Sequence, residues 1–132
     1  MKKAFILIFS LIILSHTISY GQNILDSIKV TFGGKFNDSL TKEQIIEADS
    51  IQIFYRNNIT NYNVQVLSFQ ITLLYDGMEI EEANTQNKLS EKQKIIIRER
   101  LMINQSLYIE NIKANVNNKI VSLGTLRFIC KE

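Results

Sequence analysis

The sequence predicts a mainly β fold, namely an antiparallel β-sandwich of about six or seven strands with two short capped helices. The first observation is the run Tyr62–Tyr75, which contains no Gly or Pro and is rich in β-branched and aromatic residues. The second is Asp76-Gly77, a two-residue hairpin signal directly after that run. A long central strand that turns back through a hairpin suits a sandwich better than a parallel α/β sheet.

The long strand changes its alternation once. Its apolar residues stand at even positions in Tyr62, Val64 and Val66, and at odd positions from Leu67 to Tyr75. A shift of one residue sends every later side chain to the opposite face of a sheet. We therefore expect a β-bulge or a bend near Val66–Leu67, which would keep both apolar sets on a core side.

Before this strand, the pattern predicts two short strands around one helix. Ile28–Phe32 alternates and is ended by Gly33-Gly34, and Ile51–Tyr55 alternates in the same way. Between them, Thr41-Lys42-Glu43-Gln44 has the spacing of a capping box, in which the first and last side chains satisfy each other's backbone N–H groups. The helix is expected over Lys42–Ala48.

After the hairpin turn, the chain is expected to form one more helix and four more strands. A second capping box, Ser90-Glu91-Lys92-Gln93, begins that helix, and Asn104 suits a left-handed residue after its end. Asn117-Asn118 predicts a turn, and Gly124 a bulge or bend. Ala83–Lys88 is expected to be a polar loop. The expected elements are the strand Met78–Glu82, the helix Glu91–Met102, and the strands Leu107–Ala114, Lys119–Leu123 and Leu126–Cys130.

The N-terminus has the pattern of a secretory signal peptide. Met1-Lys2-Lys3 is cationic, Ala4–Leu14 is apolar, and Ser15–Gly21 is polar and small. We expect cleavage before Gln22 and a single domain over residues 22–132, in the periplasm or outside the cell. An uncleaved membrane anchor remains the alternative, although the apolar run is short for a span of about 20 residues.

Cleavage would change the charge and the chemistry of the chain. The 15 Lys and Arg residues lose Lys2 and Lys3, which leaves 13 against 13 Asp and Glu. A neutral domain is not expected to bind nucleic acid or an anionic membrane. The single histidine, His16, lies in the signal, so histidine-based triads and zinc sites are not expected in the mature chain. We therefore expect no catalytic residue, cofactor or metal.

Two features have a structural and a functional interpretation. Gly33-Gly34-Lys35 lacks the spacing of a phosphate-binding loop and predicts a plain turn. Cys130, the single cysteine, shares a strand face with Leu126 and Phe128 and is expected to be buried. The alternative is an intermolecular disulfide near the terminus.

The acidic residues Glu79, Glu81 and Glu82 form a patch around the hairpin. Glu79 and Glu81 share a strand face and could serve a glycosidase or a calcium site. Because nothing supplies the rest of such a site, a solvated strand face is the favoured interpretation. Two short sequence patterns for glycosylation are less specific than this acidic patch. Asn-x-Ser/Thr occurs at Asn37, Asn58 and Asn104, and Asp-Ser-apolar, which some bacteria use for O-glycosylation, occurs at Ser27, Ser39 and Ser50.

Four segments follow one another along the chain, namely L-T-K-E-Q-I-I-E-A-D-S-I-Q-I, V-Q-V-L-S-F, L-S-E-K-Q-K-I-I-I-R-E-R-L and L-Y-I-E-N-I-K-A. Their order and spacing resemble the C-terminal domain of GldM-type proteins, which form the periplasmic shaft of the gliding-motility and type IX secretion machinery. The resemblance covers Ser39–Phe69 and Ser90–Lys131. It implies a β-rich assembly domain without catalysis, and a homodimer. The chain differs in having Asn104 and Asn117-Asn118 where the family tends to have glycine.

The transmembrane helix and the shaft domains of the family have no counterpart in this sequence, so we expect a freestanding, exported copy of the end domain. Its expected function is to bind a protein partner in the cell envelope, through unpaired strand edges that template pairing with another chain. Neither the partner nor its interface is predicted. The alternatives are a carrier of a small apolar ligand, with a pocket between the sheets, and a hydrolase that uses carboxylates alone.

Overall fold

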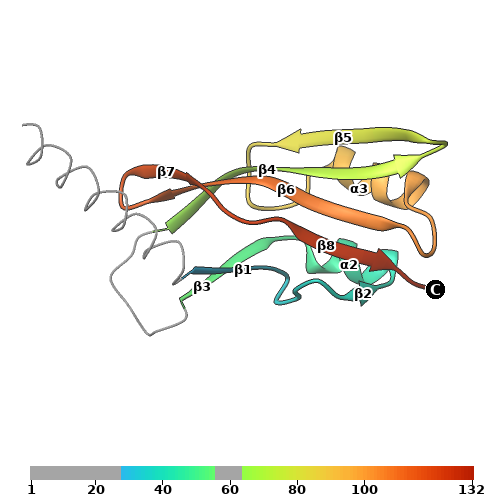
Figure 1. Cartoon of the computed structure of the whole chain (residues 1–132), viewed down its shortest axis with the longest axis horizontal. Coiled ribbons are helices and arrows are strands. Elements are labelled where there is room, and N and C mark those ends of the chain that lie inside the picture. Colours follow the sequence, from blue (N-terminus) through green and yellow to red (C-terminus); the bar gives the residue numbers. More distant parts are fainter. Residues whose placement is uncertain (1–27, 56–63) are drawn as a thin grey trace, which may run out of the picture.

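A computed structural model describes residues 28–55 and 64–132 (Figure 1). This part of the chain is mainly β and has two short helices, as the sequence predicts. Its elements are β1 (Ile28–Phe32), β2 (Ser39–Leu40), α2 (Lys42–Ala48), β3 (Ile51–Tyr55), β4 (Val64–Tyr75), β5 (Met78–Asn84), α3 (Glu91–Arg100), β6 (Ser106–Val116), β7 (Lys119–Ser122) and β8 (Leu126–Cys130).

The strands form one large and one small sheet. Six strands belong to the large sheet, in the order β2-β8-β6-β4-β5 with β7 beside β6, and β1 pairs with β3 in the small one. β6 pairs with β4 along one edge and with β7 and then β8 along the other (Figure 1). Pairing is interrupted around the exposed Gly124, where the Leu123 N–H donates to the Ile112 carbonyl at 2.8 Å. The register is the same on both sides, Lys113 with Ser122 and Ile109 with Leu126, so the sequence expectation of a bulge or bend at Gly124 is met only by a gap in the pairing and not by a bulge.

One strand was not expected from the sequence. Ser39-Leu40, which reads as the approach to the first helix, forms β2 and pairs with the chain's end in β8 in parallel, so the large sheet is not wholly antiparallel. Leu40 is 3% exposed, and its carbonyl accepts a hydrogen bond from the Lys131 N–H at 3.0 Å. This short segment, with Leu40 buried, thus pairs with a strand some 90 residues later in the sequence. No local sequence pattern indicates this pairing.

The core lies on one face of the large sheet. β4, β6 and β8 send alternate side chains toward α3, α2 and β1, and the rings of Phe32 and Phe128 meet at 6.0 Å between their centroids. This contact joins β1 of the small sheet to β8 of the large one. The largest fully buried side chains are Phe32, Ile45, Phe69, Ile71, Leu73, Ile97, Leu101, Leu107, Ile109, Ile112, Leu126 and Phe128.

The change of phase in the apolar alternation of the long strand coincides with an irregularity in the pairing of β4 with β6. The register of β4 against β6 shifts between Val66 and Ser68 and again between Ser68 and Gln70, which confirms the expected bulge or irregularity near Val66–Leu67. On β6, Asn111 has a φ of 50° and donates through its side-chain amide to the Gln70 side chain at 3.1 Å. Tyr62, the first residue of the expected strand, lies outside the described residues.

Both helix starts are as predicted. Thr41 and Gln44 form a full capping box at α2, and Ser90 and Gln93 form the same pair of hydrogen bonds at α3. α3 ends at Arg100 and not at Met102, because the fully buried Leu101 takes an extended backbone. No helix in residues 28–55 and 64–132 has the length and hydropathy needed to cross a membrane.

The turns are also as predicted, but one loop is shorter. The left-handed residues include the expected turn pairs Asp76-Gly77 and Asn117-Asn118, and Asn104 at a φ of 66°. β5 continues to Asn84, so the expected loop begins later. Asn84 is buried and donates to the Gln93 side-chain oxygen at 3.0 Å, while the Gln93 amide donates to the Glu82 carbonyl at 2.9 Å. These bonds anchor the end of β5 to the start of α3.

Candidate functional site

The large sheet has a covered face and an open one. Phe69, Ile71 and Leu73 of β4 point into the core, on the side where α3 packs. On the same side, the exposed Arg100 of α3 places its guanidinium 4.5 Å from the centre of the Tyr75 ring. The intervening residues of β4 point to the opposite side, because side chains alternate along a strand. With their neighbours on β5 and β6 they form what we call the outer face, made of Gln70, Thr72, Leu74, Glu79, Glu81, Tyr108 and Glu110.

The pairing register fixes which of these residues are neighbours. Thr72 stands between Glu81 of β5 and Tyr108 of β6, Leu74 stands beside Glu79, and Gln70 stands beside Glu110. In the described part of the chain, no helix or strand pairs with or packs on this face. Leu74 is 56% and Tyr108 is 38% exposed, which leaves two large apolar side chains in contact with solvent.

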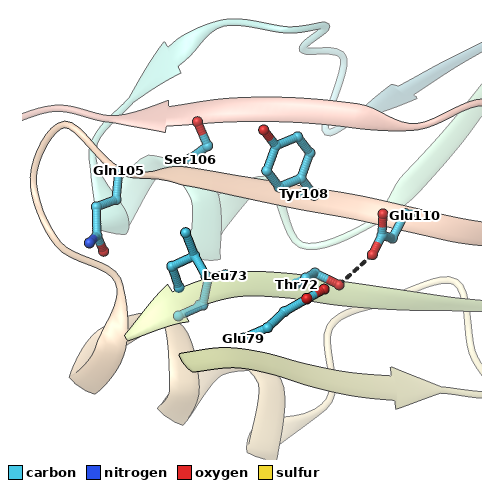
Figure 2. Close-up of a pocket in the computed structure, with 8 residues that line it drawn as sticks. Thr72, Leu73, Glu79, Gln105, Ser106, Tyr108 and Glu110 are labelled. Carbon is cyan, nitrogen blue, oxygen red and sulfur yellow. Dashed lines mark hydrogen bonds between the residues drawn. The ribbon is translucent and has the colours of Figure 1, made fainter. Parts of the chain in front are cut away.

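A groove with a volume of about 460 Å³ opens on the outer face (Figure 2). Its walls come from the end of β4, the start of β5, and the first half of β6 with the residue before it. Figure 2 shows Gln105 and Leu73 toward one end of this groove and Glu110 toward the other. The lining residues are Thr72, Leu73, Leu74, Glu79, Gln105, Ser106, Tyr108 and Glu110.

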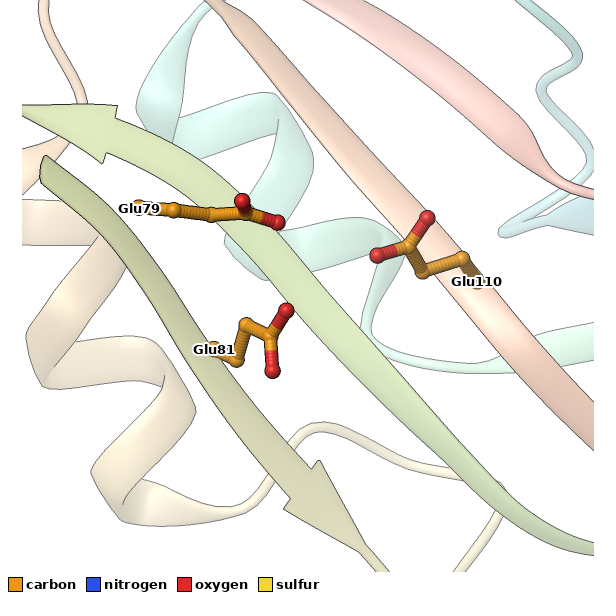
Figure 3. Close-up of side chains that lie close together, drawn as sticks. All are labelled: Glu79, Glu81 and Glu110. Carbon is orange, nitrogen blue, oxygen red and sulfur yellow. The ribbon is translucent and has the colours of Figure 1, made fainter.

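Three carboxylates gather at one end of the groove. Glu79, Glu81 and Glu110 each place a side-chain oxygen within 4.8 Å of the other two (Figure 3). Glu110 is held in place, because the Thr72 hydroxyl donates to its carboxylate at 2.6 Å and the Gln70 amide donates to the Thr72 hydroxyl at 3.0 Å. A sheet surface with this much negative charge attracts cationic groups.

The neighbouring side chains shift the pKa of the Glu81 carboxyl. A hydrogen bond with Glu79, partial desolvation and the repulsion of Glu79 and Glu110 raise the pKa of the Glu81 carboxyl above its ordinary value. Across β6, the side chain of Arg127 lies beside Tyr108 in the register, but its Nε donates to the Ser106 hydroxyl at 2.9 Å. The positive charge of Arg127 is thus held at the other end of the groove, away from the carboxylates.

This cluster predicts a dependence of stability on pH. A carboxyl whose pKa is raised on folding stabilises the folded chain most below the ordinary pKa of about 4.3, and this contribution is lost as the pH rises through the raised value. We expect Glu81→Gln to melt higher than the wild type at pH 7 and at the same temperature near pH 4. Thermal unfolding of both proteins across this range measures the difference. A difference that does not change with pH would contradict the assignment.

The sequence identified only part of this cluster. Glu79 and Glu81 are exposed on one strand face, as expected, but Glu82 points elsewhere and pairs with Lys92 of α3 at 3.1 Å. Glu110 was not expected to join them. Alternation along β6 places it opposite the apolar residues of that strand, yet only the register of β4 with β6 shows that it reaches Glu79 and Glu81.

The other candidate residues lie in structural positions. Cys130 is fully buried, which confirms that expectation and disfavours an intermolecular disulfide, and burial raises the pKa of its thiol. Gly33-Gly34 forms a turn closed by paired backbone hydrogen bonds between Phe32 and Lys35. Ser39 is exposed and Ser50 is half-buried. Ser27 and Asn58, two further modification candidates, lie outside the described residues.

No protein-family model matches this sequence, and neither does any curated protein. The function is therefore argued from the geometry of the outer face and from the sequence. The groove opens to solvent on the outer face and not between the two sheets, so it lends no support to a ligand carrier of the expected kind.

Proposed function

We propose that this chain is an exported, non-enzymatic assembly module that binds a protein partner through the outer face of its large sheet. The observation that carries this proposal is the groove beside Leu74 and Tyr108, two exposed apolar side chains on a face that the described elements leave open. Aromatic side chains next to a concave surface are frequent energetic centres of protein interfaces. A partner side chain inserted into this groove would remove both from water.

The strand edges are the rival surfaces. β5 is one edge of the large sheet, but Glu79, Glu81 and Glu82 stand along it, and charged residues of this kind oppose pairing with another strand. β7 is a second edge, only four residues long, with Ile120 71% exposed. The outer face combines a recess with two exposed apolar side chains, whereas β7 offers the single side chain of Ile120 and the backbone hydrogen bonds of a short edge.

The sequence supports an assembly role in the cell envelope. The signal-like N-terminus favours export to the periplasm or beyond, and the resemblance to the end domain of GldM-type shaft proteins favours an interaction module. That resemblance also allows the partner to be a second copy of this chain. Light scattering of the purified protein over a concentration series separates a homodimer from a monomer that needs another protein.

The proposal predicts that two changes on the outer face release the chain from its complex. In cells of the source organism, a tagged chain with Leu74→Ser and Tyr108→Ser is expected to sediment at its own mass, while the wild type sediments in a larger complex. The matched control, Ile95→Ser with Ile120→Ser, removes two exposed apolar side chains from α3 and β7.

Each result of this experiment has a clear meaning. Retention of the complex by the Leu74→Ser, Tyr108→Ser variant contradicts the proposal, and release by the control instead assigns binding to β7 or α3. Circular dichroism of the purified variants checks that each is folded, so that loss of the complex is not loss of the fold.

A further inference from the structure

The groove on the outer face has two ends of different chemistry. Leu74 gives one end an apolar surface, beside Ser106 and the Arg127 side chain that Ser106 holds, and we call this the apolar end. Tyr108 lies along the wall between the ends. Glu79, Glu81 and Glu110 converge at the acidic end (Figures 2 and 3). An occupant that complements both ends must carry an apolar group and a positive charge in one molecule.

The negative charge at the acidic end has no cationic partner in the described part of the chain. The ion pairs of this part involve Lys92 and Lys94 on α3, with Glu82, Asp49 and Glu91, and none involves Glu79, Glu81 or Glu110. The Thr72 hydroxyl supplies one hydrogen bond to Glu110 but no charge. The pKa of Glu81 is raised by the same neighbours, first through its hydrogen bond with Glu79, then through desolvation and the repulsion of Glu79 and Glu110.

We propose that the groove takes a basic segment of the partner protein, with a Lys or Arg at the three carboxylates and an apolar side chain beside Leu74 and Tyr108. This inference rests on the proposed function and specifies the partner's chemistry. On β4, Thr72 pairs with Glu81 of β5, and Leu74 lies two residues further along the same strand. An extended segment spans about 6.6 Å between residues i and i+2, whose side chains point the same way. The pattern basic-x-apolar therefore matches the groove.

The apolar end favours such a segment over a bare cation. A metal ion at Glu79, Glu81 and Glu110 would satisfy their charge but leave Leu74 and Tyr108 exposed to water. A lysine or arginine attached to a peptide neutralises the carboxylates and buries apolar area in the same event. An arginine could also lie over the Tyr108 ring, which attracts cations.

Three short capped peptides test the inference on the purified protein. The probe is Lys-Ser-Leu-Ser-Lys, and the matched peptides are Lys-Ser-Ser-Ser-Lys and Glu-Ser-Leu-Ser-Glu. In amide NMR spectra, only the probe is expected to shift the signals of Thr72, Tyr108 and Glu110. We expect its Kd to rise about fivefold or more in the Glu79→Gln, Glu81→Gln variant, and to rise with added salt. The control variant Glu47→Gln, Glu99→Gln, which removes the same charge from exposed helix positions, should bind the probe unchanged.

Equal binding of the three peptides, or equal binding of the probe to the Glu79→Gln, Glu81→Gln variant, would overturn the inference. So would Ca²⁺ alone shifting the same signals and displacing the probe, because the carboxylates would then form a cation site. A failure of this inference can be distinguished from a failure of the proposed function. If the native complex depends on Leu74 and Tyr108 but the probe does not bind, only the basic segment is excluded.

Discussion

Phe128→Ala is expected to cost about 3–5 kcal/mol in the free energy of unfolding, which is the usual loss when a buried phenylalanine leaves a cavity. The Phe128 ring is fully buried on β8 and meets the ring of Phe32 on β1 at 6.0 Å between centroids, with an angle of 51° between the ring planes. It therefore contributes to the core and to the contact between the two sheets. A domain of this size has a stability of about 5–15 kcal/mol, so this one change removes a large part of it.

Chemical denaturation of the wild type and the variant measures this loss. The matched control is Phe36→Ala, because Phe36 is 50% exposed and touches Lys29 through its ring face. We expect the control to lose about 1 kcal/mol or less. Similar losses in the two variants would mean that the Phe32–Phe128 contact does not hold the sheets together.

The second large effect is expected at Gly33. Its φ is +55°, and a Cβ there would lie 2.4 Å from the Ala48 Cβ and 2.6 Å from the Ala48 Cα. The obstacle is the end of α2 itself, which cannot rotate away as a flexible side chain could. Gly33→Ala is therefore expected to lose about 3 kcal/mol or more, from the left-handed backbone and the steric overlap together.

Two other glycines separate these causes. Gly34 and Gly77 also have positive φ, but a Cβ at Gly34 would have only the Gln52 side chain, at 4.0 Å, and a Cβ at Gly77 nothing within that range. Their alanine variants should each lose about 1–2 kcal/mol, the cost of the backbone conformation alone. Thermal unfolding ranks the three variants. If Gly33→Ala loses no more stability than Gly34→Ala, the turn does not lie as close to Ala48 as these distances indicate.

The local features of this fold could be predicted from the sequence because their signals are local. A capping box needs four residues, and the turns at Asp76-Gly77 and Asn117-Asn118 need two each. The bulge in β4 was also predictable, since a single change of phase in the alternation marks it. In each case neighbouring residues determine the backbone conformation.

The groove could not be predicted in the same way, because it depends on how distant segments align. Glu79 and Glu110 come together only through the register of β5 and β6 on either side of β4. A shift of one residue in either pairing would separate them. The parallel pairing of Ser39-Leu40 with β8 could not be predicted for the same reason, since neither segment has a sequence pattern that indicates its pairing partner.

The most direct test of a docking role for the outer face is site-specific photo-crosslinking in cells of the source organism. A benzophenone amino acid replaces Tyr108 on the outer face or, as the control, Ile95 on the exposed side of α3. We predict one discrete protein adduct from position 108, weakened by Leu74→Ser, and none from position 95. No adduct at position 108, or the same adduct from both positions, would contradict the assignment of the outer face as the binding surface.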